Sequence, residues 1–126
     1  MTAATQGRYP GRASIDAYGN GGFRFAGMSH RGSILCLPSA IEAWDPISVA
    51  DITPQTFRRV LVERETIEIL LVGTGRNVVL LPRPIVDALR EAGVGVDAMD
   101  TGAACRTYNI LLAEGRAVAA ALLAVD

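Results

Sequence analysis

The densest group of polar side chains lies in residues 99–116, in a chain that is otherwise mostly apolar. Arg106 and Asn109 are three residues apart, so on a helix their side chains project from the same side. Asp100 or Thr101 can cap the N-terminus of that helix. A guanidinium, a carboxamide and free helical N–H groups together favour a site for an anion or a carboxylate. The alternative is structural, with Arg106 paired to a backbone carbonyl or to an acidic residue.

A second polar stretch, Gly73-Thr74-Gly75, follows an apolar run at the sheet edge where open α/β sheets bind ligands. Val78 occupies the third glycine position of the dinucleotide-binding fingerprint, so that motif is excluded. A Walker phosphate-binding loop is excluded as well, because no Gly-Lys-Ser/Thr follows. Either these N–H groups and Thr74 bind a small anion or a partner's carbonyl, or the glycines allow a tight turn and close packing against the helix at 101–114. The binding site that we predict comprises Gly73, Thr74, Gly75, Thr101, Arg106 and Asn109.

Cys105 is the candidate reactive group, because a helix N-terminus lowers the pKa of a thiol. Nucleophilic catalysis also needs a base, and the sole histidine, His30, falls in a predicted turn. The alternative interpretation is that Cys105 is a small buried apolar residue, as we expect for Cys36. The two cysteines lack Cys-x-x-Cys spacing and a histidine cluster. We therefore predict no metal site and no cofactor.

The composition limits the classes of partner. The net charge is −1 and all 12 basic residues are arginine, so there is no basic excess and we expect no nucleic-acid partner. The longest fully apolar run, 117–125, is shorter than the ~20 residues that a transmembrane helix needs. The first residues lack the apolar segment of a secretory signal. We expect a cytoplasmic protein, at most peripheral at the inner membrane.

The order of predicted elements indicates one α/β domain over residues 13–126, preceded by a flexible tail at 1–12. The first third of the domain is a predicted β-meander, with turns at 19–22 and 29–32. Its strands are expected at 14–18, 23–26, 33–37 and 41–44.

The rest of the chain alternates between helices and strands. A helix starts at Thr53-Pro54 and ends near Glu63. From residue 67 onward the pattern is βαβαβ, which favours parallel pairing. Its members are a strand at 67–72, a helix opened by Pro84, a strand at 94–99, a helix from 101 and a strand at 117–125. We predict a three-layer α/β domain: a central mixed β-sheet, helices on one side, and the N-terminal β-meander as a further layer.

Several stretches together resemble one family of small α/β domains of unknown function. They are Gly22 to Ser33, Gly73 to Gly75, Met99 to Thr101 and Ala104 to Asn109. The family is related to the mitochondrial assembly factor 3 family of respiratory complex I. The resemblance implies a three-layer fold whose mixed sheet has one strand antiparallel to the rest. It also implies a non-enzymatic role with protein partners.

Residues and resemblance together predict a binding or assembly factor that assists biogenesis of respiratory complex I or another inner-membrane complex. Its partner is expected to be a protein, such as a membrane-complex subunit. The first alternative is a small-molecule or anion-binding protein, or an enzyme, that uses the Gly73–Gly75/Arg106 pocket with Cys105 as reactive group. The second is a protein that oligomerises through its β-layer.

Overall fold

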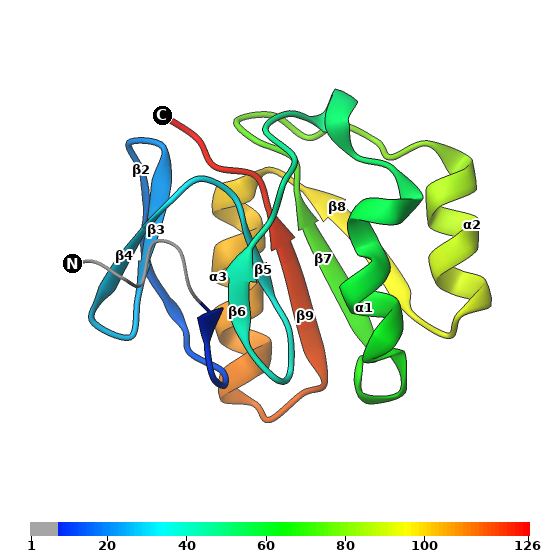
Figure 1. The fold of residues 1–126 in the computed structure, drawn as a ribbon, viewed down its shortest axis with the longest axis horizontal. Coiled ribbons are helices and arrows are strands. Elements are labelled where there is room, and N and C mark those ends of the chain that lie inside the picture. The colour runs from blue at the N-terminus through cyan, green and yellow to red at the C-terminus, as the bar shows by residue number, and fades with distance from the viewer. Residues whose placement is uncertain (1–7) are drawn as a thin grey trace.

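The computed structural model describes residues 8–126, which form a six-stranded mixed sheet, a separate three-stranded sheet and three α-helices (Figure 1). The strands are β1 (Arg8–Tyr9), β2 (Ile15–Gly19), β3 (Gly22–Phe25), β4 (Met28–Arg31), β5 (Ile34–Cys36), β6 (Ile41–Ala43), β7 (Ile69–Gly73), β8 (Gly95–Met99) and β9 (Val118–Leu122). The α-helices are α1 (Arg58–Val62), α2 (Arg83–Glu91) and α3 (Thr101–Ala113). Short 3-10 helices lie at Val49–Asp51, Pro54–Phe57 and Arg64–Thr66.

The large sheet has the strand order β1-β6-β5-β9-β7-β8. Strand β7 pairs in parallel with both β8 and β9, as the βαβαβ pattern predicts. Strand β5 is antiparallel to β9 and to β6, and β1 is antiparallel to β6. The mixed sheet is confirmed, but two strands, β5 and the two-residue β1, run against the others where the resemblance implied one.

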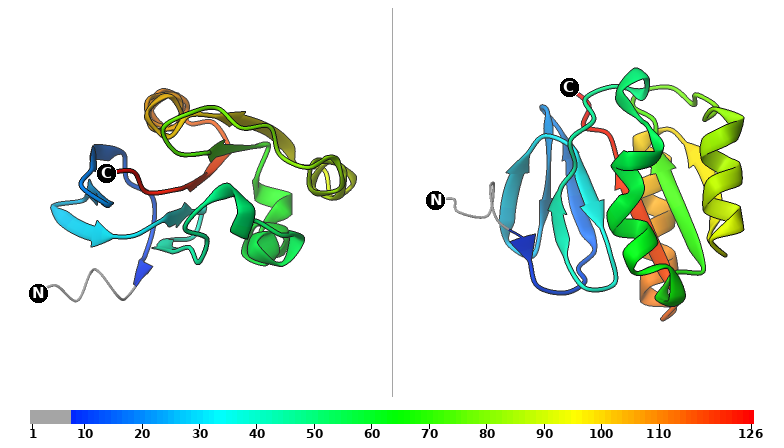
Figure 2. Two further views of the ribbon diagram at one scale, coloured as in Figure 1. Left: turned by 90° about the horizontal axis from the view of Figure 1, so that it is seen from above. Right: turned by 45° about the vertical axis from the view of Figure 1, so that its right-hand side comes forward.

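Layers cover both faces of the large sheet (Figure 2). Leu70 of β7 packs in one core cluster with side chains of α1 and α2, whereas Leu71 packs in a second cluster with α3 and the three-stranded sheet. Successive side chains of a strand point to opposite faces, and β7 is apolar on both. The expectation of helices on one side was therefore wrong, because each apolar face requires its own cover.

The three-stranded sheet is the predicted β-meander, with β2 and β4 both antiparallel to β3. The turn predicted at 29–32 was wrong, because β4 occupies most of that range. Ala26 (φ 51°) and Gly27 (φ 74°) make the turn instead, directly between the paired residues Phe25 and Met28. Two successive residues with positive φ are typical of a two-residue hairpin turn.

Residues 1–7 of the predicted tail lie outside the described residues. Residues 8–12 differ from the expected tail, because Arg8 and Tyr9 form β1 and pair with Glu42 and Ile41 of β6. The Tyr9 ring packs edge-on against Phe25, with 6.1 Å between the ring centroids. One aromatic side chain thus anchors a polar N-terminal segment on the domain.

The ends of α3 follow from local chemistry. Asp100 is the N-cap, and its side chain accepts a hydrogen bond from the N–H of Ala103 (2.9 Å). Gly115 adopts φ 74° just after the helix, the left-handed conformation that closes many helices. The chain then enters β9, whose residues are all buried. Both ends of α3 and the strand after it are confirmed.

Candidate functional site

The bend at Gly73–Thr74–Gly75 lies directly against the first residue of α3. Thr101 donates its backbone N–H to the Gly75 carbonyl (2.8 Å), and the Gly75 N–H donates to Thr101 Oγ1 (3.0 Å). The Thr101 hydroxyl donates in turn to the carbonyl of Leu123 (2.8 Å), just after β9. Thr101 is fully buried. The structure thus brings Gly75 and Thr101 together, but with their hydrogen-bonding groups satisfied inside the protein.

Thr74 is the second polar centre of this bend, and only 5% of its surface is exposed. Its N–H donates to the carbonyl of Met99 at the end of β8 (2.9 Å). Its hydroxyl donates to the carbonyl of Asn77 (2.6 Å) and accepts from the N–H of Val79 (3.1 Å). Thr74 therefore organises the loop that leads to α2, and its hydroxyl is not free to bind an anion.

Two glycines allow close packing around the start of α3. A methyl group on Gly73 would lie 3.0 Å from the Cα and the Oγ1 of Thr101, closer than normal packing allows. A methyl group on Gly102 would collide with the hydroxyl of Tyr18. The space expected beside Gly102 for a ligand is therefore occupied by the Tyr18 side chain.

A shallow hollow lies beside Gly75 at the N-terminus of α3. It is lined by Tyr18, Gly75, Arg76, Asp100, Gly102, Val125 and Asp126. Asp100 is engaged as the N-cap, and Arg76 donates to a backbone oxygen of Asp126 (3.3 Å). With two acidic residues and one arginine in its lining, the hollow does not have the charge that an anion requires.

Arg106 and Asn109 lie outside this hollow, more than one helical turn after Thr101. The side chain of Asn109 accepts from the N–H of Ile15 (2.8 Å) and donates to its carbonyl (2.8 Å). Asn109 thereby fastens the start of β2 to α3, which uses both ends of its amide. Arg106 is exposed on the same helix.

Neither cysteine has the surroundings of a nucleophile. Both are buried free thiols. Burial raises the pKa of Cys105 to about 12, although the nearby Arg106 charge acts in the opposite direction. Burial also raises the pKa of Cys36. His30, itself buried, has its Nε2 3.2 Å from the carbonyl of Ser33, to which it donates, so this nitrogen is not free to act as a base.

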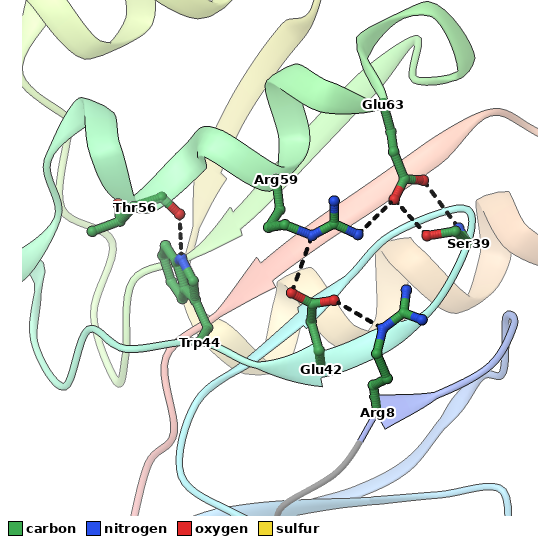
Figure 3. Close-up of polar contacts among 7 residues, drawn as sticks. All are labelled: Arg8, Ser39, Glu42, Trp44, Thr56, Arg59 and Glu63. Carbon is green, nitrogen blue, oxygen red and sulfur yellow. Dashed lines mark hydrogen bonds and ion pairs between the residues drawn. The ribbon is translucent and has the colours of Figure 1, made fainter.

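Reasoning from sequence missed a polar network that joins β1, β6 and α1 (Figure 3). Glu42 accepts from the Nε atoms of Arg8 (3.4 Å) and Arg59 (3.4 Å). Arg59 also donates to Glu63 (3.3 Å), which accepts in addition from the N–H (3.1 Å) and hydroxyl (2.5 Å) of Ser39. Only the i,i+4 spacing of Arg59 and Glu63 carried a local signal. The paired charges hold elements together and leave no carboxylate free for acid–base chemistry here.

The described residues offer neither a cluster of metal ligands nor a helix able to span a membrane. Residues 8–126 contain no group of three or more His, Cys, Asp or Glu side chains that could hold a metal ion. No helix in the same range combines the length and apolar character needed to cross a membrane.

Comparison with known proteins places these features in a wider group. Residues 15–123 match a family model described as "Protein of unknown function (DUF498/DUF598)". The mouse NADH dehydrogenase [ubiquinone] 1 alpha subcomplex assembly factor 3 is 36% identical over 94% of this chain. The chain spans 64% of the length of that mouse protein.

Solved structures share the fold at high similarity. One is the crystal structure of an outer membrane protein from Bartonella henselae, whose sequence is 55% identical to this chain. The match covers 94% of this chain and 99% of that one, with a TM-score of 0.90. The solution structure of a Mth938-like domain from Bordetella pertussis is 35% identical, with a TM-score of 0.79 over 89% of this chain and 85% of that one.

Proposed function

Because the chain belongs to the DUF498/DUF598 family, we propose that the protein is a non-enzymatic binding and assembly factor. Its role would be to assist the biogenesis of a membrane complex, with respiratory complex I as the first candidate. The observation that supports this role is the similarity to the mouse assembly factor over 94% of the present chain. Its partner would be a protein, such as a subunit of that complex.

Arg106 is the member of the predicted site best placed to contact such a partner. The hydroxyls of Thr74 and Thr101 and the amide of Asn109 are engaged in internal hydrogen bonds. The Arg106 side chain is exposed, and a guanidinium binds carboxylates through two parallel hydrogen bonds. We place an acidic side chain or a C-terminal carboxylate of the partner at Arg106. Asn109 would not orient it, because Ile15 occupies its amide.

The rival function, an enzyme or small-molecule binder with Cys105 as reactive group, has less support. A thiol with a pKa of about 12 is ionised at neutral pH in about one molecule in 10⁵. The thiolate, not the thiol, is the nucleophile. The hollow beside Gly75 is lined by Asp100 and Asp126 and does not include Cys105.

Replacement of Arg106 by Ala tests this proposal. We expect R106A to lose most of the membrane-complex subunits that the wild-type protein captures from its host, as measured by pull-down and mass spectrometry. Its free energy of unfolding should stay within about 0.5 kcal/mol of wild type, because the side chain is exposed. R24A, at an exposed arginine of β3, is the matched control and should capture normally. Unchanged capture by R106A would contradict the role of Arg106.

A further inference from the structure

The β8 edge of the large sheet is open. Strand β8 is the last in the strand order and pairs only with β7 among the described residues. The Gly95 N–H and the Met99 carbonyl point to β7, where they bind Glu68 and Thr74. Because hydrogen-bonding directions alternate along a strand, the N–H and carbonyl groups of Val96 and Ala98 point away from the sheet. They are available to an added strand.

A groove of mixed character, with apolar side chains and two arginines in its lining, runs beside this edge, between β8 and α2. It is lined by Leu80, Leu81, Arg83, Val86, Arg90, Val96, Asp97 and Ala98. The loop that enters it carries three consecutive exposed apolar residues, Val78 (57% exposed), Val79 (41%) and Leu80 (84%). Contiguous apolar surface of this kind marks protein-binding sites.

The two faces of β8 differ in character. Val96 packs against the core cluster that contains residues of α2, whereas Met99 packs against the cluster that contains α3. Asp97 lies two residues before Met99 and so shares its face. Asp97 is exposed and forms no ion pair within residues 8–126. An added strand would therefore meet, on one face, a groove whose lining includes Leu81, Val86 and two arginines, and on the other face the unpaired side chain of Asp97.

We propose that β8 is the docking edge for an extended segment of a partner protein, which adds to the sheet as a further strand with the pattern apolar–basic–apolar. The basic side chain would lie opposite Asp97. Its two neighbours would point to the other face and enter the groove lined by Leu81 and Val86. This mode of recognition takes affinity from main-chain hydrogen bonds and specificity from alternate side chains. It rests on the protein-binding role proposed above and specifies the segment that is bound.

A second copy of this chain would fit the β8 edge less well than a segment with a basic side chain, because of charge repulsion. Two β8 strands paired antiparallel form the most hydrogen bonds when Val96 of one copy lies opposite Ala98 of the other. That register places Asp97 directly opposite its own counterpart, and like charges so placed are destabilising. A register shifted by two residues separates these charges but leaves one hydrogen-bonded pair in place of two. A lysine or arginine opposite Asp97 has neither defect.

Two synthetic peptides test the proposal, Thr-Thr-Val-Lys-Val-Thr-Thr and the same peptide with Glu in place of Lys. We expect the Lys peptide at millimolar concentration to shift the amide NMR signals of Val96 and Ala98 and to protect these amides from exchange. The Glu peptide should bind about threefold to tenfold more weakly. In D97K this preference should reverse. D16K, which reverses an exposed carboxylate of β2, should retain the preference of wild type.

Several outcomes would overturn the proposal. They are the absence of shifts at Val96 and Ala98 with either peptide, an equal affinity for both peptides, and concentration-dependent dimerisation through β8, which would identify a second copy as the occupant. The pull-down described above separates these failures from failure of the proposed function. If wild type and D97K capture the same subunits, the assembly role stands and the edge proposal falls. If the wild-type protein captures no membrane-complex subunit, the assembly role fails, whatever the peptides show.

Discussion

The two edge strands of the six-stranded sheet, β1 and β8, differ in length and in their side-chain contacts. At one edge, β6 is covered by β1, a strand of two residues, and Glu42 of β6 lies between Arg8 and Arg59. At the other edge, β8 has five residues and no partner on its outer side within the described chain. A very short edge strand with paired charges resists further pairing, whereas a longer edge strand with unpaired backbone groups invites it.

The contrast indicates which parts of the molecule are built for stability and which are free to bind. Polar groups at the β1–β6 edge and at the start of α3 have partners inside the protein. The outward groups of Val96 and Ala98 do not. A donor hydrogen that is already engaged must give up its internal contact before it can bind a partner. New contacts are therefore expected where hydrogen-bonding groups are free.

The largest expected effect concerns the core between the large sheet and α3, which contains both cysteines. Burial raises the pKa of Cys105 to about 12 and also raises the pKa of Cys36. Above about pH 9 the unfolded chain releases these protons while the native protein keeps them, so stability should fall as pH rises. The loss is up to about 1.4 kcal/mol per pH unit for each thiol. Urea unfolding between pH 8 and pH 11 measures it.

The matched control for this pH dependence is C105A. It removes one of the raised pKa values, so its stability should fall less steeply with pH than that of wild type. Below about pH 8 the thiols are protonated in both states, and the two proteins should then show parallel, flat profiles. Equal slopes above pH 9 would mean that Cys105 is not protected from ionisation in the folded protein.

A smaller effect, confined to the β8 side, is expected for T74V. The valine keeps the shape of Thr74 but leaves the Val79 N–H and the Asn77 carbonyl without their partner. We expect a loss of about 2 kcal/mol in the free energy of unfolding. Hydrogen exchange should accelerate at Val79 more than at Ile41 on the other edge. T107V, at a half-buried position of α3, is the control and should cost less. Equal acceleration at both edges would show that the edges are not independent.

The sequence predicted what local chemistry determines. Asp100 and Gly115 marked the ends of α3, and the order of apolar segments predicted the parallel pairing of β7 with β8 and β9. The layer arrangement was less accessible, because alternation within an all-apolar strand such as β7 does not say what covers each face.

The candidate site was the least predictable part. Arg106 and Asn109 have the spacing of a joint site, but Asn109 binds Ile15, which is 94 residues away in the sequence. Thr101 was expected to face a ligand, yet its hydroxyl binds Leu123. Spacing along a helix shows which side chains lie close together on that helix. It carries no information about which backbone groups the rest of the chain brings to them.

The smallest expected effect is that of R59M, at the β1–β6 edge. Arg59 bridges Glu42 and Glu63, whose side chains are 20% and 14% exposed. Because these groups keep contact with water, and Arg8 and Ser39 still face the two carboxylates, we expect a loss of about 1 kcal/mol or less. The loss should shrink in high salt, which screens exposed charges. Urea unfolding at low and high salt measures both quantities.

The control for R59M is R83M, since Arg83 pairs with Asp87 at 3.6 Å on the exposed side of α2. That pair should contribute nothing measurable, because its side chains are 86% and 51% exposed and water screens their attraction. A cost for R59M above that for R83M would show that the ion pairs of Arg59 stabilise the β1–β6 edge. Equal costs would show that these ion pairs add no stability, and the contrast with β8 would then rest on backbone pairing alone.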